Sequence, residues 1–111
     1  MRRNRNLSKS DFRKVFADNV SSADKDMVVL AQRNQFYYSR LGLAISKKYA
    51  SRAVDRNRLK RVIRESVRLN QPLLSSLDII VINRKGLVKR SNKEIFMALD
   101  RHWQKLNQKF N

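Results

Sequence analysis

The chain has 111 residues, enough for one domain and too few for two independent hydrophobic cores. It contains no cysteine, which excludes disulfides and thiolate metal sites, and no apolar stretch near the ~20 residues that a membrane-spanning helix needs. These two features lead us to expect a cytoplasmic protein. Its 26 Lys and Arg against 9 Asp and Glu give a net charge of +17, so we expect its partner to be a polyanion, with nucleic acid the natural choice.

The N-terminal segment predicts an arm followed by a helix. Residues 1 to 7 are basic and polar without hydrophobic periodicity, which indicates a short flexible arm. A short helix should run from Ser8 or Ser10 to near Asn19, because apolar residues recur there at helical spacing after a serine that can cap the helix. Asp11 would lie near the positive end of the helix dipole.

Two strand-length apolar runs come next, Met27 to Ala31 and Leu41 to Ile45, and residues 20 to 22 form a short leading strand. The connection between the two longer runs, residues 32 to 39, is too short for a parallel crossover. We therefore expect these strands to form an antiparallel hairpin or meander.

The segment from Arg52 to Leu69 predicts a helix with one apolar and one basic side. The apolar side should pack into the core and consists of Leu59, Val62, Ile63 and Val67. The opposite side carries Asn57, Lys60, Arg61, Arg64 and Arg68. Asp55 and Glu65 are the only carboxylates of the segment, so pairs within the helix cannot neutralise its cations. We predict that the basic side binds phosphates, a role for which arginine is well suited.

Two other interpretations of this basic side are open. Charged residues on a helix commonly form only a solvated face, and an anionic membrane surface also attracts cations. The scarcity of acids argues against the first interpretation. The lack of Trp or Phe on the apolar side argues against the second.

The last third of the chain predicts one strand and one long helix. Asn70 and Pro72 end the basic helix, and the β-branched run from Leu77 to Ile82 reads as a buried strand, so strand, helix and strand form a crossover unit. Residues 84 to 86 form a loop. Ser91 and Glu94 then have the spacing of a capping box. The helix that they open has an apolar stripe expected in the core, made of Ile95, Phe96, Leu99, Trp103, Leu106 and Phe110.

The sequence offers little catalytic machinery. Its one histidine, His102, is expected at the surface or its boundary, with an acid–base role as the alternative. Asp24 and Asp26 lie together in a turn, where carboxylates are commonly solvated, and the alternative is a pair of metal ligands in a nuclease. Its only two glycines are far apart, so no glycine-rich phosphate loop is present. We expect a protein that binds without catalytic or metal-ligating residues of its own.

The basic helix resembles, in sequence and spacing, the RNR motif of the bacterial ribonuclease P protein component. Further segments resemble that family in the same order along the chain, so that the resemblance is carried by Asp11–Phe16, Arg40–Gly42, Ser46–Lys48, Ala53–Val54, Arg56–Arg61, Arg64–Glu65 and Asp78–Ile82. Two positions depart from the family. Leu30 stands where some members have tyrosine, which would weaken base stacking, and Ala50 stands where some have glycine, which would alter the loop before the helix.

This resemblance implies a protein subunit that partners a catalytic RNA in removing the 5′ leader from precursor tRNA. The RNA would supply the active site and hold most of the Mg²⁺, so the holoenzyme is an endonuclease whose protein subunit is not itself catalytic. No obligate protein partner is implied. The implied fold is a single α+β domain, an α-β sandwich with a mostly antiparallel sheet and a left-handed β-α-β crossover, in the order α-β-β-β-α-β-α.

The resemblance also implies which residues bind RNA. In the family the basic helix and the preceding loop face the catalytic RNA, which here implicates Arg40, Lys47, Lys48, Arg52, Arg56, Asn57, Arg58, Lys60, Arg61, Arg64 and Arg68. The family's leader-binding cleft lies between the first helix and the sheet, which implicates Phe12, Phe16 and Leu30. Sequence alone would favour ordinary core packing for the two phenylalanines. With the resemblance, we expect them to stack on leader bases.

Two other functions fit the sequence. A structural ribosomal RNA-binding protein would share the charge and size of this chain but would show no dependence on a leader. A stand-alone nuclease would use Asp24 and Asp26 and would cleave precursor tRNA without any RNA subunit.

Overall fold

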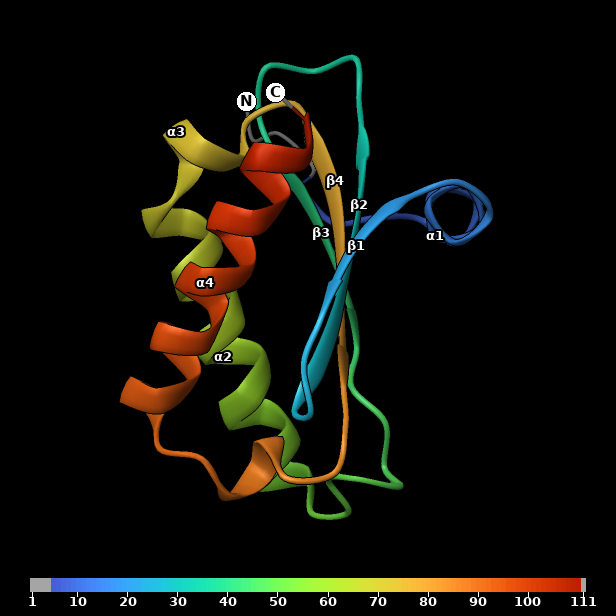
Figure 1. Ribbon diagram of the computed structural model, residues 1–111. Coiled ribbons are helices and arrows are strands. Elements are labelled where there is room, and N and C mark those ends of the chain that lie inside the picture. The colour runs from blue at the N-terminus through green and yellow to red at the C-terminus, as the bar shows by residue number, and fades with distance from the viewer. Residues whose placement is uncertain (1–4, 111) are drawn as a thin grey trace.

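The computed structural model describes residues 5 to 110, which form a four-stranded sheet with helices on both faces (Figure 1). The elements in chain order are α1 (Lys9–Ala17), β1 (Val20–Ala23), β2 (Met27–Arg33), β3 (Arg40–Ala44), α2 (Ala53–Leu69), α3 (Gln71–Leu74), β4 (Leu77–Asn83), the 3-10 turn η1 (Leu87–Lys89) and α4 (Asn92–Phe110). The predicted α-β-β-β-α-β-α order is confirmed. Sequence analysis missed α3, which Pro72 opens because proline is tolerated in the first turn of a helix.

The strands lie in the order β1-β2-β4-β3. β1 and β2 form an antiparallel hairpin, whereas β4 pairs antiparallel with β2 and parallel with β3. The predicted pairing of the second and third strands as a hairpin or meander is therefore wrong, because β4 lies between them. β4 is buried along nearly its whole length, as a central strand requires. The predicted crossover unit, β3-α2-β4, is confirmed, and its left-handed sense stays a prediction.

The larger core lies between the sheet and the pair α2 and α4, which cover the same face (Figure 1). The predicted apolar side of α2 and the central residues of the α4 stripe are buried there. Ser66 is also buried, and its hydroxyl accepts a hydrogen bond of 2.9 Å from Trp103 Nε1, so the two helices are joined by a satisfied polar contact. The predicted capping box of Ser91 and Glu94 is present at the start of α4.

A smaller core lies on the other face, where α1 alone crosses the strands (Figure 1). It is built from Val15 of α1 packed on Leu30 and Ile80 of the sheet. Ser8 and Asp11 cap α1 reciprocally, and these hydrogen bonds, together with Arg40, lower the pKa of the Asp11 carboxyl. The first helix is thus held by both its cap and its apolar side.

The N-terminal segment is paired with the sheet edge from residue 5 onward. The Leu41 amide donates to the Arg5 carbonyl at 2.7 Å, and the Leu7 amide donates to the Leu41 carbonyl at 3.2 Å. These hydrogen bonds place residues 5 to 7 beside β3, and the flexibility of the arm stays a prediction. Residues 1 to 4 of that arm lie outside the described residues.

His102 is buried at 2% exposure, so its predicted place at the surface or boundary is wrong. Its Nδ1 lies 2.7 Å from the Ser22 hydroxyl and its Nε2 lies 2.8 Å from Asp24 Oδ2. Both ring nitrogens therefore have partners, which is what allows a histidine to be buried. Ser22 of β1 and Asp24 of the turn that follows supply these partners, and no local pattern in the sequence links them to α4.

Candidate nucleic-acid interface

The predicted basic side of α2 lies at the surface. Four of the predicted residues on this helix are exposed, namely Asn57, Arg61, Arg64 and Arg68, and Lys60 is half-buried. Lys60, Arg61 and Arg64 form no ion pair with any carboxylate among residues 5 to 110. Arg68 pairs with Glu65. The free cations are available to phosphates, as the excess of positive charge on this segment predicts.

The segment before α2 continues this surface. Lys47 and Lys48 are exposed in the loop after β3, and Lys48 Nζ lies 5.3 Å from the centre of the Tyr49 ring. Arg52, the N-cap residue of α2, is exposed and lies 3.8 Å from the carboxylate of Asp55. An exposed ion pair of this length contributes little to stability, so Arg52 can exchange its partner for a phosphate.

Two arginines of the predicted set make internal contacts instead. Arg56 donates to the carbonyls of Ala50 and Ser51 at 3.0 and 2.8 Å, which fixes the loop before the helix. Arg58 donates to the Val88 carbonyl of η1 at 2.8 Å and to Asn92 Oδ1 at the start of α4, also at 2.8 Å. Both residues are half-buried, and their hydrogen bonds fix the backbone around the basic side. Their contact with RNA stays a prediction.

Arg40 is also largely enclosed, with 15% of its side chain exposed. It donates to both carboxylate oxygens of Asp78, at 2.8 and 2.6 Å, and to Asp11 at 3.2 Å. The bonds to Asp78 raise the pKa of the guanidinium further. Arg40 thus joins β3, β4 and α1, and sequence reasoning missed Asp11 and Asp78 because ion pairs between distant segments leave no local pattern.

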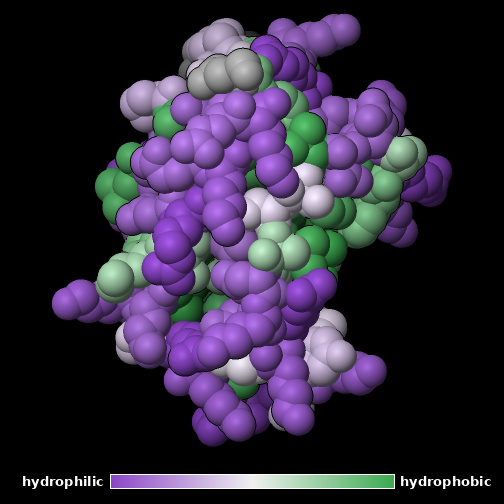
Figure 2. Space-filling model, viewed as in Figure 1, coloured by the Kyte–Doolittle hydropathy of each residue, from purple (hydrophilic) through white to green (hydrophobic). Residues whose placement is uncertain are grey.

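The predicted leader-binding residues lie together on the α1 face of the sheet. Phe12 is half-buried, Phe16 is 50% exposed and Leu30 is buried under α1. The two phenyl rings stack at 6.3 Å between centroids. Beside them the sheet presents a row of half-buried apolar residues that α1 does not cover, made of Val28, Ile82 and Ala44 in register. Figure 2 shows hydrophobic side chains beside α1, where hydrophilic ones cover most of the rest of this view.

The predicted leader-binding residues and the apolar row beside them form one surface, the α1 groove. The α1 groove and the basic side of α2 meet at the β3 edge. The residues that line a hollow of about 190 Å³ at this edge include Phe12 of α1, Gly42 of β3, and Lys60 and Arg64 of α2. Sequence reasoning did not assign Gly42 to the site. The signal was present, however, because a glycine inside a strand often marks a close approach of another group.

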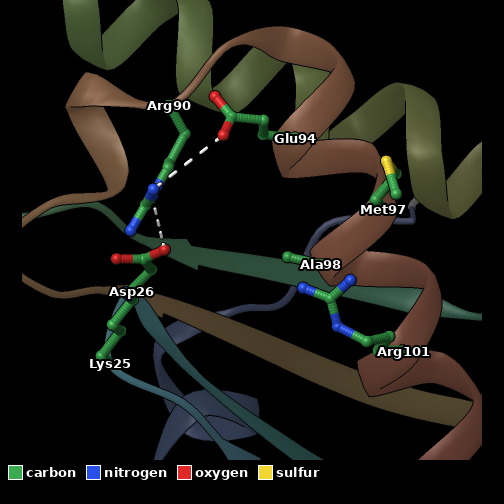
Figure 3. A pocket seen from close by; sticks show the side chains of 7 residues that line it. All are labelled: Lys25, Asp26, Arg90, Glu94, Met97, Ala98 and Arg101. Carbon is green, nitrogen blue, oxygen red and sulfur yellow. Dashed lines mark hydrogen bonds and ion pairs between the residues drawn. The ribbon is translucent and has the colours of Figure 1, made fainter.

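The carboxylates considered as nuclease metal ligands are used in structural contacts. Asp26 is 9% exposed and accepts from Arg90 at 2.9 Å, and Arg90 also approaches Glu94 at 3.9 Å (Figure 3). Asp24 accepts from two backbone amides of its own turn and from His102. The expectation that this pair is solvated is therefore wrong for Asp26. Among residues 5 to 110, no group of three or more His, Cys, Asp or Glu side chains is placed to hold a metal ion.

No helix within residues 5 to 110 is both long and apolar enough to cross a bilayer.

Comparison with known proteins gives consistent matches. The ribonuclease P family model matches residues 1–107. The Staphylococcus aureus RNase P protein structure aligns with a TM-score of 0.84 at 29% identity, covering 92% of this chain and 94% of that one. The Thermotoga maritima RNase P protein aligns with a TM-score of 0.79 at 31% identity, covering 96% and 97%. The latter protein in complex with 1-(4-fluorophenyl)-2-thiourea aligns with a TM-score of 0.75 at 33% identity, covering 82% and 89%.

Proposed function

Since the chain belongs to the ribonuclease P protein family, we propose that it is the protein subunit of a cytoplasmic ribonuclease P, the endonuclease that removes the 5′ leader from precursor tRNA. The observation that carries this proposal is the hollow at the β3 edge, which Phe12 of the α1 groove lines together with Lys60 and Arg64 of α2. One continuous surface then offers phosphate-binding cations and base-stacking rings, which together suit single-stranded RNA.

The two parts of the surface would have different tasks. The basic side of α2 and the loop before it bind the folded catalytic RNA through its phosphates, and exposed arginines are suited to two-point phosphate contacts. The α1 groove takes the unpaired leader, with Phe16 stacking on a base and the open row of Val28, Ile82 and Ala44 supplying apolar contact. Leu30 lies beneath α1 at 8% exposure, so it supports the groove from below.

The chemistry would be carried by the RNA subunit. Mg²⁺ is the metal that this activity implies, and the carboxylates and histidine of the described residues do not form a cluster that fits it. In the proposed holoenzyme Mg²⁺ is held mainly by RNA phosphates, and the protein contributes affinity and substrate positioning. No obligate protein partner is required.

The decisive experiment measures 5′ leader cleavage of precursor tRNA at low Mg²⁺ and near-physiological salt. It compares a bacterial ribonuclease P RNA alone, this protein alone, and both together. We expect cleavage only with both. Cleavage by the protein alone would point to a nuclease, and no enhancement of an RNA that is active with its own protein would favour a ribosomal RNA-binding role.

A further inference from the structure

An exposed aromatic cluster lies outside the surface described so far. The connection between β2 and β3 carries the run Phe36-Tyr37-Tyr38, in which Phe36 is 42% exposed and Tyr37 is 67% exposed. Phe36 stacks on Tyr38 with 5.2 Å between ring centroids, and Tyr37 meets Tyr38 edge-on at 5.5 Å. Tyr38 therefore supports both neighbouring rings, of which Tyr37 is the more exposed.

The backbone that carries these rings is fixed by hydrogen bonds. Asn34 Oδ1 accepts from the Phe36 amide at 2.8 Å, and Asn34 Nδ2 donates to the Tyr38 carbonyl at 3.2 Å. The Ser76 hydroxyl donates to the Phe36 carbonyl at 2.6 Å. A loop held in this way presents its aromatic faces at a low entropic cost of ordering, which favours binding.

Cations flank the aromatic cluster. The guanidinium carbon of Arg40 lies 4.8 Å from the Phe36 ring centre, and that of Arg5 lies 5.1 Å from the Tyr38 ring centre. Lys14 and Arg33 line a hollow of about 370 Å³ together with Phe36, and the two carboxylates that also line it, Asp11 and Asp78, are paired with Arg40. Exposed aromatic faces among cations are the arrangement that binds unpaired nucleobases and their phosphates.

The cluster is continuous with the C-terminal end of the basic helix. Arg5 Nη1 donates to Gln71 Oε1 at 3.2 Å, just beyond α2, and Arg5 lines a hollow of about 190 Å³ with Arg64 and Arg68 of α2. In Figure 1 the β2-β3 connection and the C-terminal end of α2 lie at the same end of the molecule. An RNA that follows the basic side of α2 to its end reaches Arg5 and then the cluster.

We propose that Phe36 and Tyr37 stack on an unpaired nucleobase of the same RNA that binds the basic side of α2. This inference rests on the proposed function, in which that RNA is the catalytic RNA. It differs from the α1 groove in place as well as in occupant, because Phe12 packs against Gly42 and lines a hollow with Lys60 and Arg64, whereas Phe36 lines a separate hollow with Lys14 and Arg33. Stacking tolerates any base, so the site would add affinity without demanding a sequence.

The test uses the full chain and a bacterial ribonuclease P RNA with which it is active. The double variant Phe36→Leu with Tyr37→Leu keeps apolar bulk but removes both ring faces. The variant Phe36→Tyr with Tyr37→Phe keeps the faces, and Met97→Leu, at an exposed residue of α4, is the control. We expect the leucine pair to weaken binding of the catalytic RNA about fivefold or more, while the ring-swapped pair and the control bind as the wild type does.

Two further readouts separate stacking from other roles. The slope of log affinity against log salt should be unchanged in the leucine pair, since no cation is lost, and the preference of the holoenzyme for precursor over mature tRNA should be unchanged as well. Wild-type affinity in the leucine pair, alongside weakened binding by Arg64→Gln, would overturn the inference. A loss confined to the precursor preference would also overturn it by making the leader the occupant.

The single variant Tyr37→Leu, at the more exposed ring, replaces the double variant if the latter melts at a lower temperature. It should weaken binding in the same direction, and wild-type affinity would again overturn the inference. If the wild-type protein itself does not bind the catalytic RNA, the proposed function is wrong. If the wild type binds and the leucine variants bind equally well, only the stacking role of Phe36 and Tyr37 is wrong.

Discussion

Phe12 packs directly against Gly42, because a Cβ built on Gly42 would lie 2.4 Å from Phe12 Cζ and 2.7 Å from Phe12 Cε2. No side chain fits at residue 42 while the ring stays where it is. The position of Phe12 in the α1 groove therefore depends on a residue of the sheet that has no side chain. This contact also explains why a strand contains a glycine, which strands otherwise disfavour.

Gly42→Ala should displace the Phe12 ring and weaken leader recognition. The ring tip can move, so we expect a stability loss of about 1 kcal/mol, at the low end of overpacking costs. The preference for precursor over mature tRNA should fall by more than this stability loss would explain. Leader preference measured with the reconstituted holoenzyme, together with urea denaturation, tests the prediction, and unchanged preference in a folded variant would contradict it.

Arg40→Gln should act on stability. The variant leaves the carboxylate of Asp78, whose side chain is 7% exposed, without its charged partner, and breaking a buried ion pair in this way costs about 3 kcal/mol. We expect a clear shift of the urea midpoint. If stability is unchanged while RNA affinity falls, the network around Arg40 is not structural and its role as an RNA ligand is the correct one.

Arg61→Gln should show the opposite behaviour, since Arg61 is an exposed cation of the basic side. Its loss should leave the urea midpoint within about 0.5 kcal/mol of the wild type, as for other surface substitutions. The slope of log affinity against log salt should become shallower by about 0.7 to 0.9 if one phosphate contact is lost. For the wild type, about six phosphate contacts give a slope of about −4 to −5, and a slope near zero would contradict the electrostatic interpretation of α2.

His102 should make the protein less stable in mild acid. Burial lowers the pKa of His102 below its ordinary 6.5, and the nearby Lys105 and Arg101 act in the same direction, whereas Asp24 opposes them. Near and below pH 6.5 the unfolded chain therefore binds more protons at this residue than the folded one does. The contribution of neutral His102 to the free energy of unfolding is fully present above this pH and is lost as the pH falls. We expect the melting temperature to drop between pH 7.5 and pH 5.

The matched variant is His102→Gln, which cannot titrate. It should have a lower melting temperature at pH 7.5 because the contacts to Ser22 and Asp24 change, but a smaller further drop toward pH 5. Asp24 has its pKa lowered from 3.8 by amide hydrogen bonds and by His102, although burial opposes this, so its own titration lies below the measured window. An equal drop in both proteins would exclude His102 as the cause.

Local patterns predicted most of the elements. The two sides of α2 follow from helical periodicity, and the cap of α4 follows from the spacing of Ser91 and Glu94, since both are properties of neighbouring residues. The position of β4 between β2 and β3 could not be predicted in this way. Strand order depends on which distant segments share the core, and the short connection after β2 favoured the wrong neighbour.

The candidate site was predictable to a similar extent. Helical spacing placed the exposed cations Arg61 and Arg64 on the basic side and left Arg58 out of it. The resemblance added Arg58, and neither could show that its partners lie 30 or more residues away near η1 and the start of α4. The burial of His102 depends on a turn 78 residues earlier in the chain. The aromatic run at residues 36 to 38 was visible in the sequence, but only the structure shows its cations and its continuity with α2.

The place of β4 at the centre of the sheet has a consequence for how the chain is made. β2 and β3 do not pair with each other. During synthesis the β1-β2 hairpin can therefore form early, whereas β3 can pair with β4 only after α2 and β4 have been made. Because domains generally fold as units, and because the apolar side of α2 packs against both the sheet and α4, that side is fully buried only when β4 and α4 have emerged. Until then the apolar side of α2, which is buried in the complete fold, is exposed together with the cations of the opposite side.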